Sequence, residues 1–172
     1  MTNTQGLSEV AAEFRRHFDK YFLGVIPRLL NEEGLHLSFL SMLAAVESLA
    51  GSYMPEQGTG ERFRAFITNF FPAAYQPHLD RLWAFRNRMI HSFNPRPFML
   101  VCHNSRMHLC DVNNVQMLNA EDFYADLITA SRAYFTALYS DPELQRRFVK
   151  RVTSDDGGRP ISSQVFESVP AK

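Results

Sequence analysis

The spacing of apolar residues predicts α-helices over most of the chain. Apolar residues recur every three or four positions in several segments, which places them on one helix face. The first predicted helix runs from residue 9 toward 30, with Ser8 as its N-cap and a kink or break near Gly24 and Pro27. Further helices are expected over 35–53, 61–71, 79 to 91 or 93, 120 or 122 to 138, and from Asp141-Pro142 to 152.

The period of the apolar pattern changes from 3.6 to 2 after the fourth helix. Segments 98–103 and 106–112 alternate, and we expect a β-hairpin that turns at Asn104-Ser105. The predicted fold is therefore all-α: an antiparallel bundle of four or five helices with a small β-hairpin insertion. Residues 1–152 would form one helical domain, and the polar residues 153–172 would form a flexible or extended tail.

The balanced charge composition means that the protein has no strong overall electrostatic field. Eighteen basic and 18 acidic residues balance, so net charge alone attracts neither nucleic acid nor a membrane surface. One segment departs from this balance, because residues 78–110 hold five Arg, four His and one acidic residue. No signal peptide or bilayer-spanning apolar run is recognised, so we expect a cytoplasmic protein with reduced thiols and no membrane partner.

Arg86 occupies the centre of an apolar helix face, which is the most unusual feature of the pattern. A guanidinium keeps its charge, so its burial without a partner is very costly. It must meet a carboxylate, a second subunit or an anionic ligand. Glu47, at the edge of the apolar face of the second helix, is the natural carboxylate, although it can equally be a solvated residue. The apolar residues of the Arg86 face are Leu79, Leu82, Trp83, Met89, Ile90 and Phe93.

His91 follows Arg86 on the same helix and is the side chain best suited to proton transfer near neutral pH. Five residues of helix place the two about 140° apart and about 7.5 Å along the axis. Asn87 projects about 40° from His91 and can orient a phosphate or the imidazole. Three interpretations stay open. Arg86 pairs internally while His91 stabilises the helix C-terminus, the long Arg86 side chain leans toward His91 in the last turn, or the two meet across a two-fold axis.

Cys102, His103, His108 and Cys110 are types of residue that can bind zinc. In the expected hairpin register Cys102 faces the core, whereas the other three face outward. The four ligands would not converge, so we expect free thiols, no metal site and no cofactor. Glycine-rich phosphate loops and metalloprotease or nucleophile-elbow motifs are absent from the sequence.

The segment Leu82-Trp83-Ala84-Phe85-Arg86-Asn87-Arg88-Met89-Ile90-His91 resembles the motif of the HEPN superfamily, the higher eukaryotes and prokaryotes nucleotide-binding domains. That motif is Arg, often followed by Asn, then His after four to six residues, near the end of a bundle helix. The resemblance extends from Ser8 to Tyr139, although only the motif is specific. In one toxin branch the motif continues His-x-Tyr. Phe93 stands there in this chain, which argues against that form of control by an antitoxin.

The resemblance implies a metal-independent endoribonuclease of the toxin or defence type, with a composite site at a homodimer interface. Arg86 and His91 would be the catalytic residues, and Asn87, Arg88 and Glu47 would bind or orient the substrate. RNA or a nucleotide would be the ligand, and an antitoxin is a further expected partner. The alternative is a non-catalytic HEPN-like module that binds nucleotide, RNA or protein. A third interpretation is a helical interaction protein in which Arg86 forms only a buried ion pair.

Overall fold

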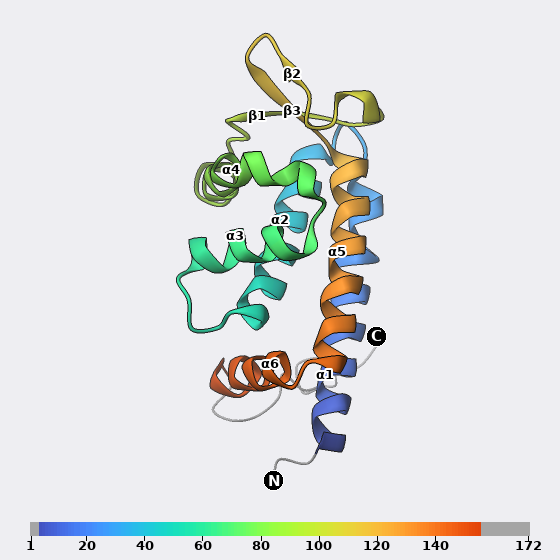
Figure 1. The fold of residues 1–172 in the computed structure, drawn as a ribbon. Helices are drawn as coiled ribbons and strands as arrows, with labels where there is room; N and C mark the ends of the chain where they lie inside the picture. Colours follow the sequence, from blue (N-terminus) through green and yellow to red (C-terminus); the bar gives the residue numbers. More distant parts are fainter. Residues whose placement is uncertain (1–3, 156–172) are drawn as a thin grey trace, which may run out of the picture.

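The protein is a helical bundle with a small sheet at one end, as seen in a computed structural model that describes residues 4–155 (Figure 1). The long helix α5 lies beside α1. Helices α3 and α4 cover another side of α2, and α6 crosses the end opposite the sheet. The helices are α1 Thr4–Phe18, α2 Leu35–Tyr53, α3 Thr59–Phe70, α4 Leu79–Ser92, α5 Ala120–Ser140 and α6 Pro142–Asp155.

Helix α2 is the centre of the core, because its apolar residues contact α3, α4, α5 and α6. Phe39, Met42, Leu43, Val46 and Leu49 are fully buried. By length and composition α2 could span a bilayer, but more than half of its apolar window is buried inside the bundle, as in the core helix of a soluble protein. Its bounds match the segment predicted from the apolar pattern.

The first helix begins earlier than the sequence suggested. It starts at Thr4, so Ser8 lies inside it and is not the N-cap. The chain continues as a π-helical turn, Asp19–Leu23, and a 3-10 turn, Ile26–Leu29, that includes Pro27. Between them the backbone packs tightly, since a Cβ on Gly24 would lie 2.9 Å from the carbonyl oxygen of Lys20. The break near Gly24 and Pro27 is confirmed.

The predicted hairpin that turns at Asn104-Ser105 is wrong. Strand β1, Phe98–Val101, pairs in parallel with β3, Val115–Asn119, while the short β2, Asp111–Val112, pairs antiparallel with β3. The tight turn lies at Asn113-Asn114, whose φ angles of 53° and 64° suit a two-residue hairpin loop. A 3-10 turn, Ser105–Met107, occupies the predicted turn position. The sheet therefore has the order β1-β3-β2.

The ends of α4 and the start of α6 follow from local chemistry. Phe93 adopts a left-handed conformation at the C-cap of α4, and the amide of Asn94 donates to the carbonyl of Arg88 at 3.2 Å. Asp141 caps α6 by accepting the amide of Glu143 at 2.8 Å. Helix α6 extends three residues beyond the predicted end at 152, and residues 156–172 of the predicted tail lie outside the described residues.

Candidate functional site

Arg86 forms an ion pair with Glu47, where α4 packs against α2. The Nη2 of Arg86 donates to Oε2 of Glu47, and the two side chains are only 13% and 18% exposed. A charge in an apolar helix face requires such a partner, because the interior does not solvate it. The pairing of Arg86 with the carboxylate that the sequence offered is confirmed.

Two further contacts fix the Arg86 guanidinium. Its Nη1 donates to Oδ1 of Asn87 at 2.9 Å, and its Cζ lies 5.2 Å from the ring centroid of Trp83. The indole face attracts the cation, while the amide and the carboxylate hold two nitrogens in different directions. The guanidinium is therefore held in one orientation by residues from α2 and α4.

The hydrogen bonding of this pair is incomplete. The Nε of Arg86 and the Oε1 of Glu47 are buried and have no hydrogen-bond partner among the described residues. Most buried polar groups in proteins are satisfied, so such atoms require an explanation. Here one donor and one acceptor lack a protein partner within the described part of the chain beside the ion pair, and both atoms are shielded from solvent.

His91 lies one helical turn beyond Asn87 and is exposed, as is Arg88. Within the described part of the chain, the His91 side chain forms no hydrogen bond or ion pair. It occupies the last turn of α4, where a positive charge is favoured. The structure brings Arg86 to Glu47 and Asn87, but it does not bring Arg86 into contact with His91 of the same chain.

Exposed apolar side chains surround the His91 end of α4. They come from α2, α4, the C-cap of α4 and β1, and their exposed fractions run from 39% to 52%. The ring of His36 lies 5.4 Å from that of Phe93, and a groove of about 590 Å³ opens between His36, Arg96, Met99 and Asn114. These apolar residues are Leu37, Ile90, Phe93 and Met99.

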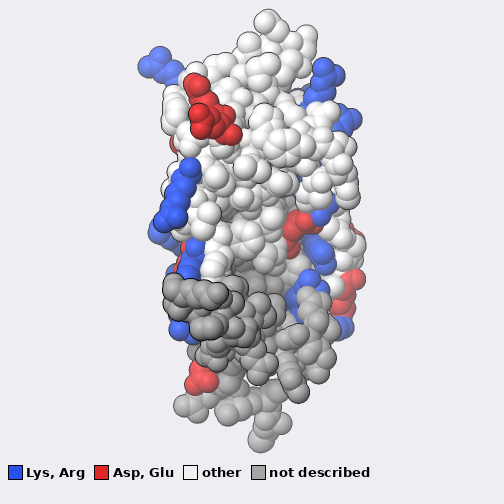
Figure 2. All heavy atoms as spheres, turned by 180° about the vertical axis from the view of Figure 1, so that it is seen from behind, with Lys and Arg blue, Asp and Glu red and all other residues white. Residues whose placement is uncertain are grey.

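Charged side chains are sparse on part of the molecular surface. Figure 2 shows the back of the molecule, where Lys, Arg, Asp and Glu lie mainly along the two edges and the upper centre is largely uncharged. Charged residues are depleted at the centres of protein interfaces, so a surface with few charges is suited to contact another protein.

A second polar cluster, which the sequence did not reveal, attaches the sheet to the bundle. The Tyr75 hydroxyl lies 2.8 Å from Nε2 of His108 and donates to Oδ2 of Asp126 at 2.8 Å. The backbone amide of Asn119 donates to Nδ1 of His108 at 3.2 Å. Because Nδ1 accepts a hydrogen bond, neutral His108 carries its proton on Nε2 and donates it to Tyr75.

Burial controls the ionisation of this cluster. It lowers the pKa of His108, and the neighbouring carboxylates Asp122 and Asp126 oppose that shift. Burial also raises the pKa of Asp126, while its hydrogen bond from Tyr75 acts in the opposite direction. The expectation that His108 faces outward with Cys110 is wrong for His108, whose side chain is 13% exposed. No sequence signal marked the burial of His108, because that burial depends on how the sheet packs against the helical bundle.

The two cysteines do not bond to each other. Cys102 is partly buried and Cys110 is exposed, and both are free thiols. Burial, together with Glu121 and Glu32, raises the pKa of the Cys102 thiol. Among the described residues no group of three or more His, Cys, Asp or Glu side chains is placed to hold a metal ion.

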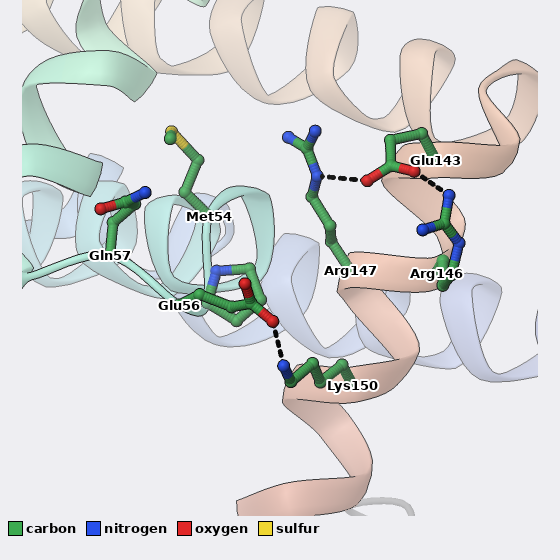
Figure 3. A pocket seen from close by; sticks show the side chains of 8 residues that line it. Met54, Glu56, Gln57, Glu143, Arg146, Arg147 and Lys150 are labelled. Carbon is green, nitrogen blue, oxygen red and sulfur yellow. Dashed lines mark hydrogen bonds and ion pairs between the residues drawn. The ribbon is translucent and has the colours of Figure 1, made fainter.

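A charged pocket at the other end of the bundle differs from the Arg86 site. It has a volume of about 450 Å³ and lies between α6 and the loop after α2 (Figure 3). There Glu143 pairs with Arg146 and Arg147, while Glu56 pairs with Lys150. Each cation thus has a carboxylate partner, and these exposed pairs contribute little stability. Because Arg146 and Arg147 share the single carboxylate of Glu143, three cations face two carboxylates in this pocket.

Comparisons with protein-family models, curated proteins and solved structures find no match to this chain.

Proposed function

We propose that the chain is a HEPN-like, metal-independent endoribonuclease of the toxin or defence type that acts as a cytoplasmic homodimer. The observation that carries the proposal is the state of Arg86. Glu47, Asn87 and Trp83 fix its guanidinium, and the side chain keeps 13% of its surface exposed. A fixed guanidinium is suited to hold a phosphate as charge develops on it.

The proposed reaction is a transesterification within RNA. His91 removes the proton of a ribose 2′-hydroxyl, and the resulting oxygen attacks the adjacent phosphorus. The bond from phosphorus to the 5′-oxygen breaks, and that oxygen takes a proton, which gives a 2′,3′-cyclic phosphate and a 5′-hydroxyl end. Arg86 holds the phosphate oxygens, Asn87 orients Arg86, and Arg88 supports binding of the backbone.

A homodimer would supply what one chain lacks. Arg86 and His91 project in different directions on one helix, so a site that needs both is completed by a second copy across a two-fold axis. The apolar side chains around His91 supply surface for that contact. An antitoxin could cover the same apolar surface and block the site.

The test is cleavage of single-stranded RNA by wild type and His91→Ala in EDTA, with identification of the product ends. We expect wild type to leave cyclic phosphate ends and His91→Ala to lose about 10²–10⁴-fold in rate. His103→Ala is the matched control, because His103 is an exposed histidine of the same basic segment. Equal cleavage by wild type and His91→Ala would contradict the assigned role.

The second candidate is a non-catalytic HEPN-like module that binds RNA, nucleotide or protein. It is favoured by the neutralisation of Arg86 by Glu47 and by the absence of contact between Arg86 and His91 in one chain. If wild type binds RNA and leaves it intact in EDTA, this function replaces the nuclease. The third interpretation, in which Arg86 forms only a structural ion pair, predicts that the protein neither binds nor cleaves RNA.

A further inference from the structure

The groove at the His91 end of α4 is lined from three separate parts of the fold. His36 comes from the first turn of α2, Arg96 from the segment between α4 and β1, and Asn114 from the turn between β2 and β3. Its volume of about 590 Å³ lies in the range of sites that hold a small molecule. The groove therefore lies where the sheet meets the helical bundle, away from the charged pocket of Figure 3.

The charge of this groove is positive and is not compensated by the protein. Arg96 is exposed, and among the described residues its guanidinium has neither a carboxylate partner nor a hydrogen bond. The described residues that line the groove include no Asp or Glu. By contrast, Arg64 and Arg86 pair with carboxylates. The planar donors of a guanidinium match phosphate oxygens, so Arg96 is suited to bind a phosphate group.

His36 offers an aromatic ring beside this cation. The ring is half-buried, and the ring of Phe93 lies 5.4 Å from it at an interplanar angle of 34°. Phe93 adopts φ 49° and ψ 35°, a conformation that is uncommon for a bulky residue and that usually selects glycine at a helix C-cap. A strained residue of this kind points to a role for its side chain. Here the phenyl ring supports the imidazole that lines the groove.

The groove also adjoins the residue proposed to act as the general base. Phe93 follows His91 by two residues, so their Cα atoms are at most about 7 Å apart. Phe93 in turn contacts His36, which lines the groove. A strand whose reacting phosphate lies at His91 therefore has a neighbouring nucleotide close to the groove.

We propose that this groove binds one unpaired nucleotide of a single-stranded RNA, next to the bond that is cut. The base stacks on His36 and forms hydrogen bonds with the amide of Asn114, which both donates and accepts. The phosphate of the same nucleotide binds Arg96. This inference rests on the proposed function and defines its substrate: a single strand, whose bases are free to turn outward, read by residues at the junction of bundle and sheet.

The first test compares two fluorescent 12-nucleotide strands, an oligoadenylate and its abasic counterpart. The full chain carries His91→Ala, so that the oligoadenylate stays intact. His36→Ala added to this chain should weaken oligoadenylate binding about tenfold and leave abasic binding unchanged, because only a base stacks on the ring. His17→Ala is the matched control, since His17 is also half-buried and lies 5.8 Å from an aromatic ring, that of Tyr21.

Two further variants test the phosphate and the base separately. Arg96→Gln should weaken binding of both strands about tenfold and reduce the slope of log affinity against log salt by about 0.7 in magnitude. Arg132→Gln, at an exposed arginine of α5, should change neither quantity. Asn114→Gly keeps the fold, because glycine adopts the left-handed φ of 64° found at Asn114. It should weaken only oligoadenylate binding, about fivefold, through loss of the amide.

Two results would overturn the inference. One is oligoadenylate binding by His36→Ala and Asn114→Gly that equals that of His17→Ala, or that falls equally for the abasic strand. The other is a shift from dimer to monomer in His36→Ala and Arg96→Gln, seen by light scattering, with oligoadenylate affinity unchanged. That pattern would make the groove a contact between two copies of the chain.

A mononucleotide probe distinguishes failure of this groove from failure of the proposed function. Adenosine 5′-monophosphate should shift the ring ¹H–¹³C resonances of His36 in wild-type protein, whereas ribose 5-phosphate should not, and neither result requires an active nuclease. If these resonances shift but RNA stays intact, the proposed nuclease fails while the groove stands. If RNA is cleaved but the resonances do not shift and His36→Ala binds oligoadenylate normally, only the nucleotide groove fails.

Discussion

Glu47 and Arg86 form an ion pair between α2 and α4 although 39 positions separate them in the sequence. The pair joins the central helix of the core to the helix that carries the candidate motif. Its low exposure and its incomplete hydrogen bonding give it two roles, because it contributes to the packing of the helices and also presents a fixed guanidinium. The two roles predict different effects for different substitutions.

Removal of one member of this pair should destabilise the fold. Truncation of one partner of a buried pair costs about 3–5 kcal/mol, and the slight exposure of both side chains places Glu47→Gln and Arg86→Ala at or below the lower end. Thermal unfolding should show each variant melting several degrees below wild type. The double variant Glu47→Leu with Arg86→Met should recover part of the loss. Unchanged melting temperatures would instead place Arg86 in an open, solvated site.

The stability of the protein should fall as the pH is lowered from 7.5 to 5.5. Burial lowers the pKa of His108 below its ordinary value of 6.5, so the unfolded chain takes up the proton first and the folded state loses stability as the pH falls. Burial and Arg81 lower the pKa of His78 as well, and His78 accepts a hydrogen bond from Gln116 at 3.0 Å. Both histidines thus connect β3 to the bundle in their neutral form.

The measurement is the melting temperature across this pH range for wild type and His108→Gln. The melting temperature of the variant should depend less on pH, because the variant lacks one group whose pKa differs between the folded and unfolded states. Asp126 acts in the opposite direction, since its raised pKa lets the folded state bind a proton first, so Asp126→Asn should steepen the fall. An identical pH dependence in wild type and His108→Gln would show that this imidazole does not titrate as its burial requires.

Self-association should depend on the apolar residues at the His91 end of α4. Ile90 is 39% exposed there, and Ile90→Glu would place a charge in the proposed interface. Light scattering at micromolar concentration should show wild type as a dimer and Ile90→Glu as a monomer with an unchanged melting profile at low concentration. Val25→Glu is the control, because Val25 is 42% exposed in the segment between α1 and α2. A monomeric wild type would remove the basis of the composite site.

The helices could be predicted from the sequence because their apolar faces are local patterns. The apolar positions of α2 from Leu35 to Tyr53 specify its bounds and most of its large buried side chains. The need of Arg86 for a carboxylate could also be predicted, since it follows from the cost of a buried charge. These features require no knowledge of how distant segments meet.

The sheet and its polar cluster could not be predicted in this way. Asn113-Asn114 and Asn104-Ser105 are both plausible turn sequences, and only the parallel pairing of β1 with β3 selects the former. The burial of His108 against Tyr75 then follows from that topology rather than from its neighbours in the chain.

Complementation between inactive variants should reveal whether the proposed active site is shared between two chains. If Arg86 of one chain acts with His91 of the other, a heterodimer of Arg86→Gln and His91→Ala contains one intact Arg–His combination. Mixing the two variants in equal amounts, with exchange of subunits, should then restore about one quarter of wild-type cleavage, because half of the dimers are mixed and each has one of two sites. The comparison is each variant alone at the same total concentration. Mixed samples that stay as inactive as the separate variants, although native mass spectrometry detects heterodimers, would contradict a site built from Arg86 and His91 of different chains.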